Sequence, residues 1–195
     1  RCYPSCSFRE YGFWALIIGT FKITFIACIV SVAFGLGAAI YLNEYASDRT
    51  RRIIKPILEI LAGIPTIVFG FFALTFVTPI LRSIIPGLGE FNSISPGIVV
   101  GIMIVPIITS LSEDAMSSVP NKIREGAFGL GATKFEVATK VVLPAATSGV
   151  VASIVLGVSR AIGETMIVSL AAGSTPTSSL SLTSSIQTMT VYIVE

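Results

Sequence analysis

Long apolar runs separated by short polar segments dominate the pattern along this chain. The runs cover residues 12–42, 57–81, 97–111 and 144–173, and the last few residues, VYIVE, are the possible start of another. Several of them approach or exceed the roughly 20 residues that a helix needs to cross a bilayer. They are too long and too continuously apolar for barrel strands. The pattern therefore predicts an all-α, polytopic transmembrane helix bundle.

Glycine, proline and small residues add detail to these spans. Gly63 and Pro65 predict a kink in the second span, and Pro106 lies inside the third. In the fourth span small residues recur at every fourth position, a spacing that lets membrane helices approach closely. These residues are Gly149, Ser153, Gly157, Ala161, Thr165, Ser169 and Gly173.

The polar segment before the fourth span has signals for two short helices. Pro120 suits the first turn of a helix, and Gly131 suits its C-terminus. Thr133 followed by Glu136 forms a capping box that starts a second helix. The first helix has an apolar face of Ile123, Ala127 and Leu130. This face either packs on the same chain or docks onto a partner protein.

Basic residues predict the orientation in the membrane. Segments 43–56 and 112–143 each contain four of them, whereas segment 82–96 contains one. The two basic segments are separated by two spans, so they lie on the same side. The excess of basic residues assigns that side to the cytoplasm. The N-terminus and the Ser/Thr-rich stretch after residue 173 then lie outside.

Composition agrees with a membrane protein and excludes several other classes. Hydrophobic residues make up 53% of the 195 residues and charged residues only 12%, with a mean hydropathy of +0.87; an ordinary globular domain is about 25% charged. The basic residues form no nucleic-acid patch. The chain has no histidine, no paired CxxC spacing and no GxxxxGK[ST] motif, which argues against a zinc site and against ATP binding by a P-loop. Cys2 and Cys6 could form a disulfide in an oxidising compartment.

The sequence RAIGET places two charges deep in the fourth span. Arg160 lies about 24 Å along the helix from Pro144, and each charge at the centre of a span costs roughly 2.5–3.5 kcal/mol. We therefore favour a substrate-path role for Arg160, Glu164 and the adjacent Thr165, and keep a purely structural ion pair as the alternative. The other intramembrane cation, Lys22, either contacts an anion or snorkels to the interface.

The chemistry of this pair suits an oxyanion. Arg160 offers planar, bidentate donors. Phosphate near neutral pH retains a proton that Glu164 could accept in a hydrogen bond, whereas a carboxylate repels fully deprotonated sulfate. The adjacent Glu113 and Asp114 raise the possibility of an intramembrane aspartyl protease. Neighbouring side chains splay apart on a helix, so we interpret these two as charges at the cytoplasmic end of the third span.

Several stretches resemble the permeases of ABC importers. Glu125, Gly126 and Ala127 match the E-A-A sequence of the family, Gly131 matches its glycine, and 143–144 match its later LP. Gly126 replaces the first alanine of that sequence. AIYLNEYAS, KPILEILAGIPTIVFGFFALTFVTPILR, GIMIVPIITSLSEDAM and RAIGETM resemble the phosphate-specific PstC type more than the sister PstA type. Sulfate and molybdate permeases usually have a GEF-like sequence where this chain has GET.

The resemblance implies a type I (MetI-like) permease fold over residues 1–195, with a coupling segment at 112–143. Relative to that family we expect this chain to lack terminal spans. It implies that Glu125, Gly126, Ala127, Gly131 and Ala132 contact a cytoplasmic ATPase dimer. The chain itself would be no enzyme and would bind no cofactor, because ATP and Mg²⁺ belong to that partner.

The other implied partners are inorganic phosphate, a PstA-like second permease subunit, and a periplasmic or lipid-anchored phosphate-binding protein. The implied location is a bacterial or archaeal inner membrane. Two alternatives remain at this point, a permease for another oxyanion and a non-transporting membrane assembly protein.

Overall fold

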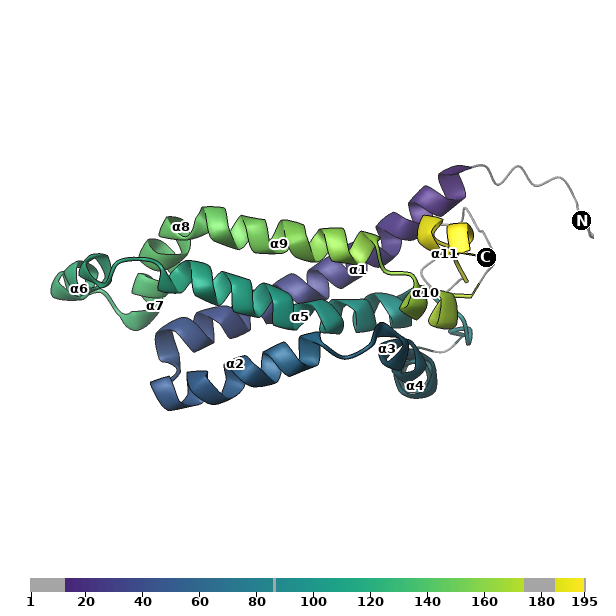
Figure 1. Cartoon of the computed structure of the whole chain (residues 1–195), viewed down its shortest axis with the longest axis horizontal. Helices are drawn as coiled ribbons and strands as arrows, with labels where there is room; N and C mark the ends of the chain where they lie inside the picture. Colours follow the sequence, from purple (N-terminus) through teal and green to yellow (C-terminus); the bar gives the residue numbers. More distant parts are fainter. Residues whose placement is uncertain (1–12, 86, 174–184, 195) are drawn as a thin grey trace, which may run out of the picture.

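The protein is a bundle of helices that lie along one long axis (Figure 1). The computed structural model describes residues 13–85, 87–173 and 185–194, and these contain helices and loops without any strand. The central helices are α1 (Phe13–Ile40), α5 (Ile94–Ser117) and α9 (Thr147–Ile162). The predicted all-α class is confirmed. Cys2, Cys6 and the Ser/Thr-rich residues 174–184 lie outside the described part.

Glycines bring α1 and α5 into close contact. A Cβ atom placed on Gly97 or Gly101 of α5 would lie within 2.9 Å of Ile26 or 2.7 Å of Val30 in α1. A Cβ atom placed on Gly35 of α1 would likewise lie 3.0 Å from the Ile108 side chain of α5. Such contacts let membrane helices pack through van der Waals attraction without a hydrophobic driving force.

The small residues of α9 pack against α5 as the four-residue spacing predicted. A Cβ atom on Gly149 would lie only 2.4 Å from the Cβ of Ala115. The hydroxyls of Ser153 and Ser112 share a buried hydrogen bond of 2.7 Å. The predicted close approach is therefore confirmed over the first part of the fourth span.

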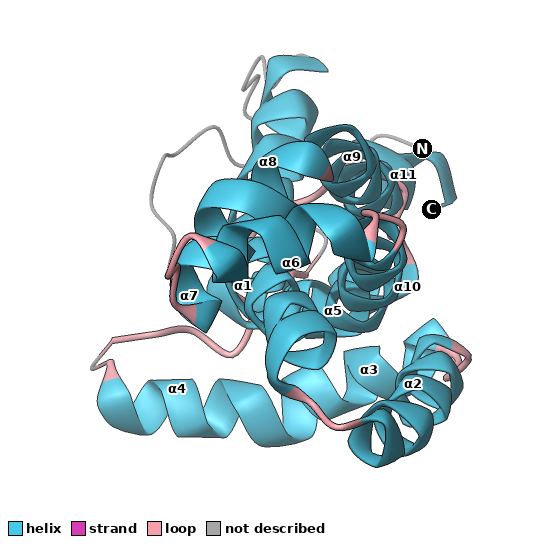
Figure 2. Ribbon diagram, turned by 90° about the vertical axis from the view of Figure 1, so that its left-hand side faces the viewer, coloured by secondary structure: helices cyan, strands magenta, loops and turns pink. Residues whose placement is uncertain are grey.

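The second span is built differently from the prediction. Helix α2 (Asp48–Ala62) begins well before residue 57 and stops at Gly63, so the predicted kink at Gly63 and Pro65 is confirmed as a complete break. Beyond it α3 (Thr66–Phe72), η2 (Ala73–Val77) and α4 (Thr78–Ile84) run crosswise to the long helices (Figures 1 and 2). The predicted kinked span over 57–81 is thus made of two separate helical stretches that run in different directions. Proline lacks an amide donor and disfavours helix at the preceding residue, which explains the break.

Two hydroxyls hold the crosswise segment on α5. The Ser95 hydroxyl donates to the carbonyl of Ala73 at 3.0 Å, and the Thr78 hydroxyl donates to the Ser95 oxygen at 2.9 Å. All of these groups are buried. Three helices of the described part, 14–45, 66–84 and 94–117, are long and apolar enough to cross a membrane.

The fourth span is interrupted at both ends. The chain passes through α7 (Lys134–Glu136), η3 (Val137–Val142) and α8 (Leu143–Ala145), bends by 76°, and continues as α9. The start near Pro144 is confirmed. However, α9 ends at Ile162, and a separate helix α10 (Met166–Ala171) follows the non-helical residues 163–165. The prediction of one helix over 144–173 is therefore wrong at its outer end.

The two basic segments lie at the same end of the bundle, as predicted. Figure 1 shows the turn from η1 (Tyr41–Tyr45) to α2 at this end together with α6 (Asn121–Gly129) and α7. We call this the basic end. The start of α1, α10 and α11 (Met189–Val194) lie at the opposite end, called the far end.

Candidate functional site

The break after α9 places the Glu164 carboxylate at the start of α10. Its Oε1 accepts hydrogen bonds from the backbone N–H groups of Met166 at 3.2 Å and Ile167 at 3.3 Å. These donors have no partner inside a helix, so a carboxylate in this position stabilises the helix start. Glu164 is only 8% exposed. The carboxylate is thus fixed by the fold of its own segment.

Arg160 lies on the exposed side of α9, four residues before Glu164. The structure shows no ion pair between them, nor any other partner for Arg160 in the described part of the chain. Arg160 and Glu164 therefore do not satisfy each other as an ion pair in this structure. Thr165 is half-buried, and its hydroxyl donates weakly to the Gly163 carbonyl at 3.4 Å. A path role for these residues stays a prediction.

Helix α11 brings the start of α1 to the same end as Glu164. The Thr190 hydroxyl donates to the Glu164 carbonyl at 3.1 Å, and the Met189 N–H donates to the Thr20 hydroxyl at 3.2 Å. Lys22, which is half-buried, lies two residues beyond Thr20. The predicted path residues Arg160, Glu164 and Thr165 and the cation Lys22 therefore all lie toward the far end of the bundle.

Buried polar side chains gather around these connections. Polar groups are expensive inside a membrane bundle and usually line a path or a site. The Thr24 hydroxyl is buried and makes no hydrogen bond within the described residues. The buried polar residues of this group are Thr20, Thr24, Glu164, Gln187 and Thr188.

At the basic end the predicted helix–glycine–helix is present. Helix α6 ends in a Schellman motif, because the Ala132 N–H bonds to the Ala127 carbonyl at 3.2 Å and the Gly131 N–H bonds to the Phe128 carbonyl at 2.9 Å. Gly131 has φ +84°, a conformation that other residues adopt only with strain. The glycine thus fixes the angle at which the chain leaves α6.

The capping box at the start of α7 is also confirmed. The Glu136 N–H donates to the Thr133 hydroxyl, and the Glu136 carboxylate accepts from the Thr133 N–H at 3.1 Å. The backbone hydrogen bond from Thr133, followed by the hydrogen bond from Lys140, lowers the pKa of the Glu136 carboxyl. The cap is therefore complete above the ordinary carboxyl pKa and is lost as the pH falls through the lowered value.

Apolar side chains of this segment stay uncovered by the chain. Leu130 is 91% exposed and Phe135 66%, and Ile123 is also exposed. Glu125 and Gly126 lie on the exposed surface, whereas Ala127 packs partly against the core. Beside them is a groove of about 420 Å³ lined by Ala127, Leu130, Gly131, Ala132, Glu136, Lys140 and Val141. The chain itself therefore partly covers the Ala127 side chain but leaves the Leu130 side chain uncovered.

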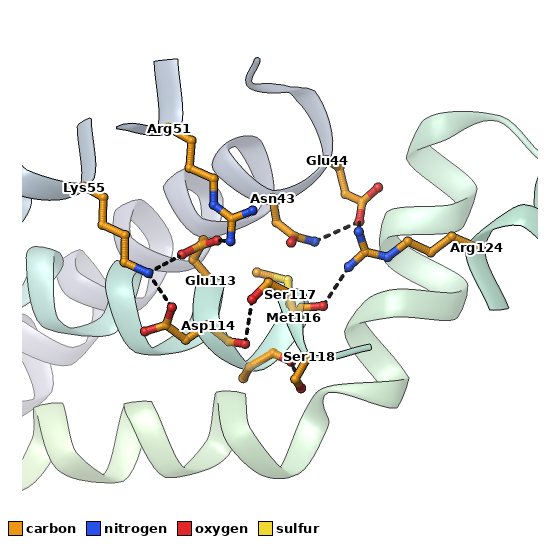
Figure 3. Close-up of polar contacts among 11 residues, drawn as sticks. Asn43, Glu44, Arg51, Lys55, Glu113, Asp114, Met116, Ser117, Ser118 and Arg124 are labelled. Atoms are coloured by element: carbon orange, nitrogen blue, oxygen red, sulfur yellow. Dashed lines mark hydrogen bonds and ion pairs between the residues drawn. The ribbon is translucent and has the colours of Figure 1, made fainter. Parts of the chain in front are cut away.

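Charged groups at the basic end form two networks that sequence reasoning missed (Figure 3). In the first, Arg51 and Lys55 of α2 pair with Glu113, which is only 2% exposed, and Lys55 also pairs with Asp114. The prediction that Glu113 and Asp114 are end charges of the third span is supported, and Glu113 in addition holds α2 on α5. In the second network Arg124 of α6 pairs with Glu44 of η1 at 3.5 Å. Partners so far apart in sequence leave no local signal.

Comparisons with known proteins agree with this architecture. Residues 31–194 match the family described as binding-protein-dependent transport system inner membrane component. The chain is 37% identical to the probable ABC transporter permease protein YqgH of Bacillus subtilis, over 88% of this chain and 56% of that protein. It is also 37% identical to the phosphate transport system permease protein PstC of Haemophilus influenzae, over 85% of this chain and 58% of that protein. The chain thus spans little more than half the length of these relatives.

A solved structure shows the same fold. The inward-facing MetNI methionine ABC transporter superposes with a TM-score of 0.64, covering 77% of this chain and 71% of that chain. Sequence identity is 22%, so this likeness concerns the fold alone. It confirms the predicted type of transmembrane bundle.

Proposed function

Because this chain belongs to the family of binding-protein-dependent transport system inner membrane components, we propose that it is a permease subunit of an ATP-driven phosphate importer. In this proposal it forms half of a path through the membrane together with a second, PstA-like permease subunit. An ATPase dimer in the cytoplasm supplies the energy, and a phosphate-binding protein outside delivers the anion. The chain itself is a transport subunit that binds neither ATP nor Mg²⁺.

The pair Arg160 and Glu164 is the observation on which the phosphate assignment rests. Arg160 has no partner among the described residues, so its guanidinium is available for bidentate contacts to an oxyanion. Glu164 uses Oε1 to cap α10, while its Oε2 accepts no hydrogen bond in the described part. That second oxygen can accept the proton of phosphate, a group that sulfate lacks at neutral pH.

The surface of α6 supports the proposed coupling to an ATPase. Leu130 and Glu125 are exposed, and the adjacent groove is bounded by Gly131 and Ala132. The Schellman motif and the capping box fix both sides of this groove. A rigid, uncovered apolar surface next to a carboxylate suits insertion into a partner's cleft. We propose Glu125, Gly126, Ala127, Gly131 and Ala132 as the ATPase-contacting residues.

Uptake of labelled phosphate tests this function. Cells that lack their own high-affinity phosphate permease would express the chain with the remaining subunits, and uptake would be followed with sulfate or molybdate as competitor. We expect ATP-dependent phosphate uptake that excess sulfate does not reduce. Preferential uptake of sulfate or molybdate would support the other oxyanion class, and no uptake of any anion by inserted protein would support an assembly role.

A further inference from the structure

Helix α6 is held against its own bundle by the partly buried Ala127 and by the polar contacts of Arg124. None of its residues is fully buried. Arg124, however, is only 16% exposed, and its Nη2 donates to the Met116 carbonyl at the end of α5 at 2.7 Å. Its Nη1 lies 3.5 Å from Glu44 Oε1 (Figure 3). A single guanidinium thus joins α6 to two other elements.

The partner carboxylate belongs to the last turn of the α1 helix. Glu44 lies in η1, a π-helical turn that continues α1 without a break, and its side chain is 6% exposed. Asn43 Nδ2 donates to the same Oε1 at 2.8 Å. Local π-helical turns of this kind are frequent at functional positions. Asn43 thus holds the Glu44 carboxylate in addition to Arg124.

We propose that Arg124 and Glu44 form a latch that orients α6 and transmits its movement to α1. This inference rests on the proposed importer function, in which α6 docks onto the ATPase. Arg124 is a positioning residue here, since it acts through Glu44 and the Met116 carbonyl. Helix α1 runs unbroken over 28 residues from Phe13 to Ile40, and its other end includes Thr20 and Lys22.

The burial of both side chains makes this ion pair costly to break. Removing one partner of a partly buried ion pair destabilises the folded protein more than removing both, because the remaining charge is left without a counter-charge. When α6 tilts, Arg124 must leave Glu44 or pull η1 with it. Since η1 is continuous with α1, the second course moves the helix that reaches the buried polar group at the far end.

The second charge network supplies a matched control. Lys55 pairs with Glu113 and Asp114 and holds α2 on α5, and neither ion pair involves a residue of α6. Its side chain is 33% exposed. Replacing Lys55 therefore removes a partly buried cation–carboxylate pair at the same end of the bundle, as replacing Arg124 does. A latch role predicts that this change leaves coupling intact.

The test uses vesicles that contain the whole importer with its ATPase, second permease subunit and binding protein. Arg124→Gln, Glu44→Gln, the double variant and Lys55→Gln would be compared for membrane abundance, bound ATPase and phosphate moved per ATP hydrolysed. We expect each single latch variant to retain the ATPase and to lower phosphate per ATP by roughly ten-fold, within the usual range of coupling between sites. The double variant should be no worse than either single one, and Lys55→Gln should match the parent.

Two results would overturn the latch. One is an unchanged ratio of phosphate to ATP in Glu44→Gln, which keeps the size and the Asn43 contact and so retains the fold even where Arg124→Gln does not. The other is a loss of uptake that is fully explained by lower abundance. If the parent importer itself shows no ATP-driven phosphate uptake, the proposed function fails, and this outcome is separate from both.

Discussion

Glu164 has a structural role that can be separated from its proposed role in transport. In Glu164→Ala the N–H groups of Met166 and Ile167 lose their acceptor. Replacing a cap by alanine costs about 0.5–2 kcal/mol, and a buried unsatisfied donor costs about 1–3 kcal/mol. Both figures describe the same two lost hydrogen bonds and are not added; because Glu164 is only 8% exposed, we expect a loss of about 1–3 kcal/mol in the free energy of unfolding.

Glu164→Gln should behave differently, because the amide oxygen can still accept both hydrogen bonds. The variant loses only the attraction between a negative charge and the start of α10, which is about 0.3–1 kcal/mol. Helix α10 has six residues, so the lower part of that range applies. Glu164→Gln should therefore remain nearly as stable as the parent.

The assay is the midpoint temperature at which detergent-solubilised protein loses its monodisperse elution peak. Thr165→Ala is the neighbouring control, since its hydroxyl makes only one weak hydrogen bond of 3.4 Å. A midpoint for Glu164→Ala equal to that of the parent would refute the cap. A midpoint for Glu164→Gln as low as that of Glu164→Ala would show that the charge itself holds the fold, and the transport phenotype would then be uninterpretable as selectivity.

Three further predictions concern packing, coupling and orientation. Gly149→Ala should lower the free energy of unfolding by about 1–3 kcal/mol, because the new Cβ would lie 2.4 Å from that of Ala115; Gly126→Ala, with no atom within 4 Å, should not destabilise, and equal midpoints for both would contradict the packing. Glu125→Arg should abolish ATP-driven uptake while leaving membrane abundance unchanged, and normal uptake would argue against docking. In a cysteine-free background, an impermeant thiol reagent applied outside should label Glu90→Cys and not Ser47→Cys, and the opposite labelling would reverse the orientation.

The helices and caps could be predicted because their signals are local. Uninterrupted apolar runs specify helices in a membrane, where backbone groups must bond within their own segment. Pro120, Gly131 and the Thr133–Glu136 box define the α6–α7 segment within a few residues of each signal. The four-residue spacing of small side chains likewise indicated the contact between α9 and α5.

The sequence contains a signal for the break at 163–165, but the long apolar run around it predicted a continuous helix. Gly163 is the C-cap of α9 and Thr165 the N-cap of α10, both residue types common at helix ends. The surrounding apolar residues suggested one continuous span. The consequence is functional, because Glu164 caps a helix and does not pair with Arg160.

The crosswise α3–α4 segment and the charge networks depend on tertiary structure. Gly63 and Pro65 predicted a kink but not the direction of the next helix, which is set by contacts such as Ser95 to Ala73. Lys55 and Glu113 are 58 residues apart, and each residue is ordinary in its local sequence. Only the packing of α2 on α5 brings them together.

The most direct test of the proposed phosphate path is uptake per inserted molecule for Arg160 variants. Labelled phosphate uptake would be divided by the amount of membrane-inserted protein for the parent, Arg160→Ala, Arg160→Lys and the exposed neighbour Ser159→Ala. The path predicts no uptake for Arg160→Ala, partial uptake for Arg160→Lys, which keeps the charge without the bidentate fork, and parental uptake for Ser159→Ala. Parental uptake per molecule in Arg160→Ala would contradict it.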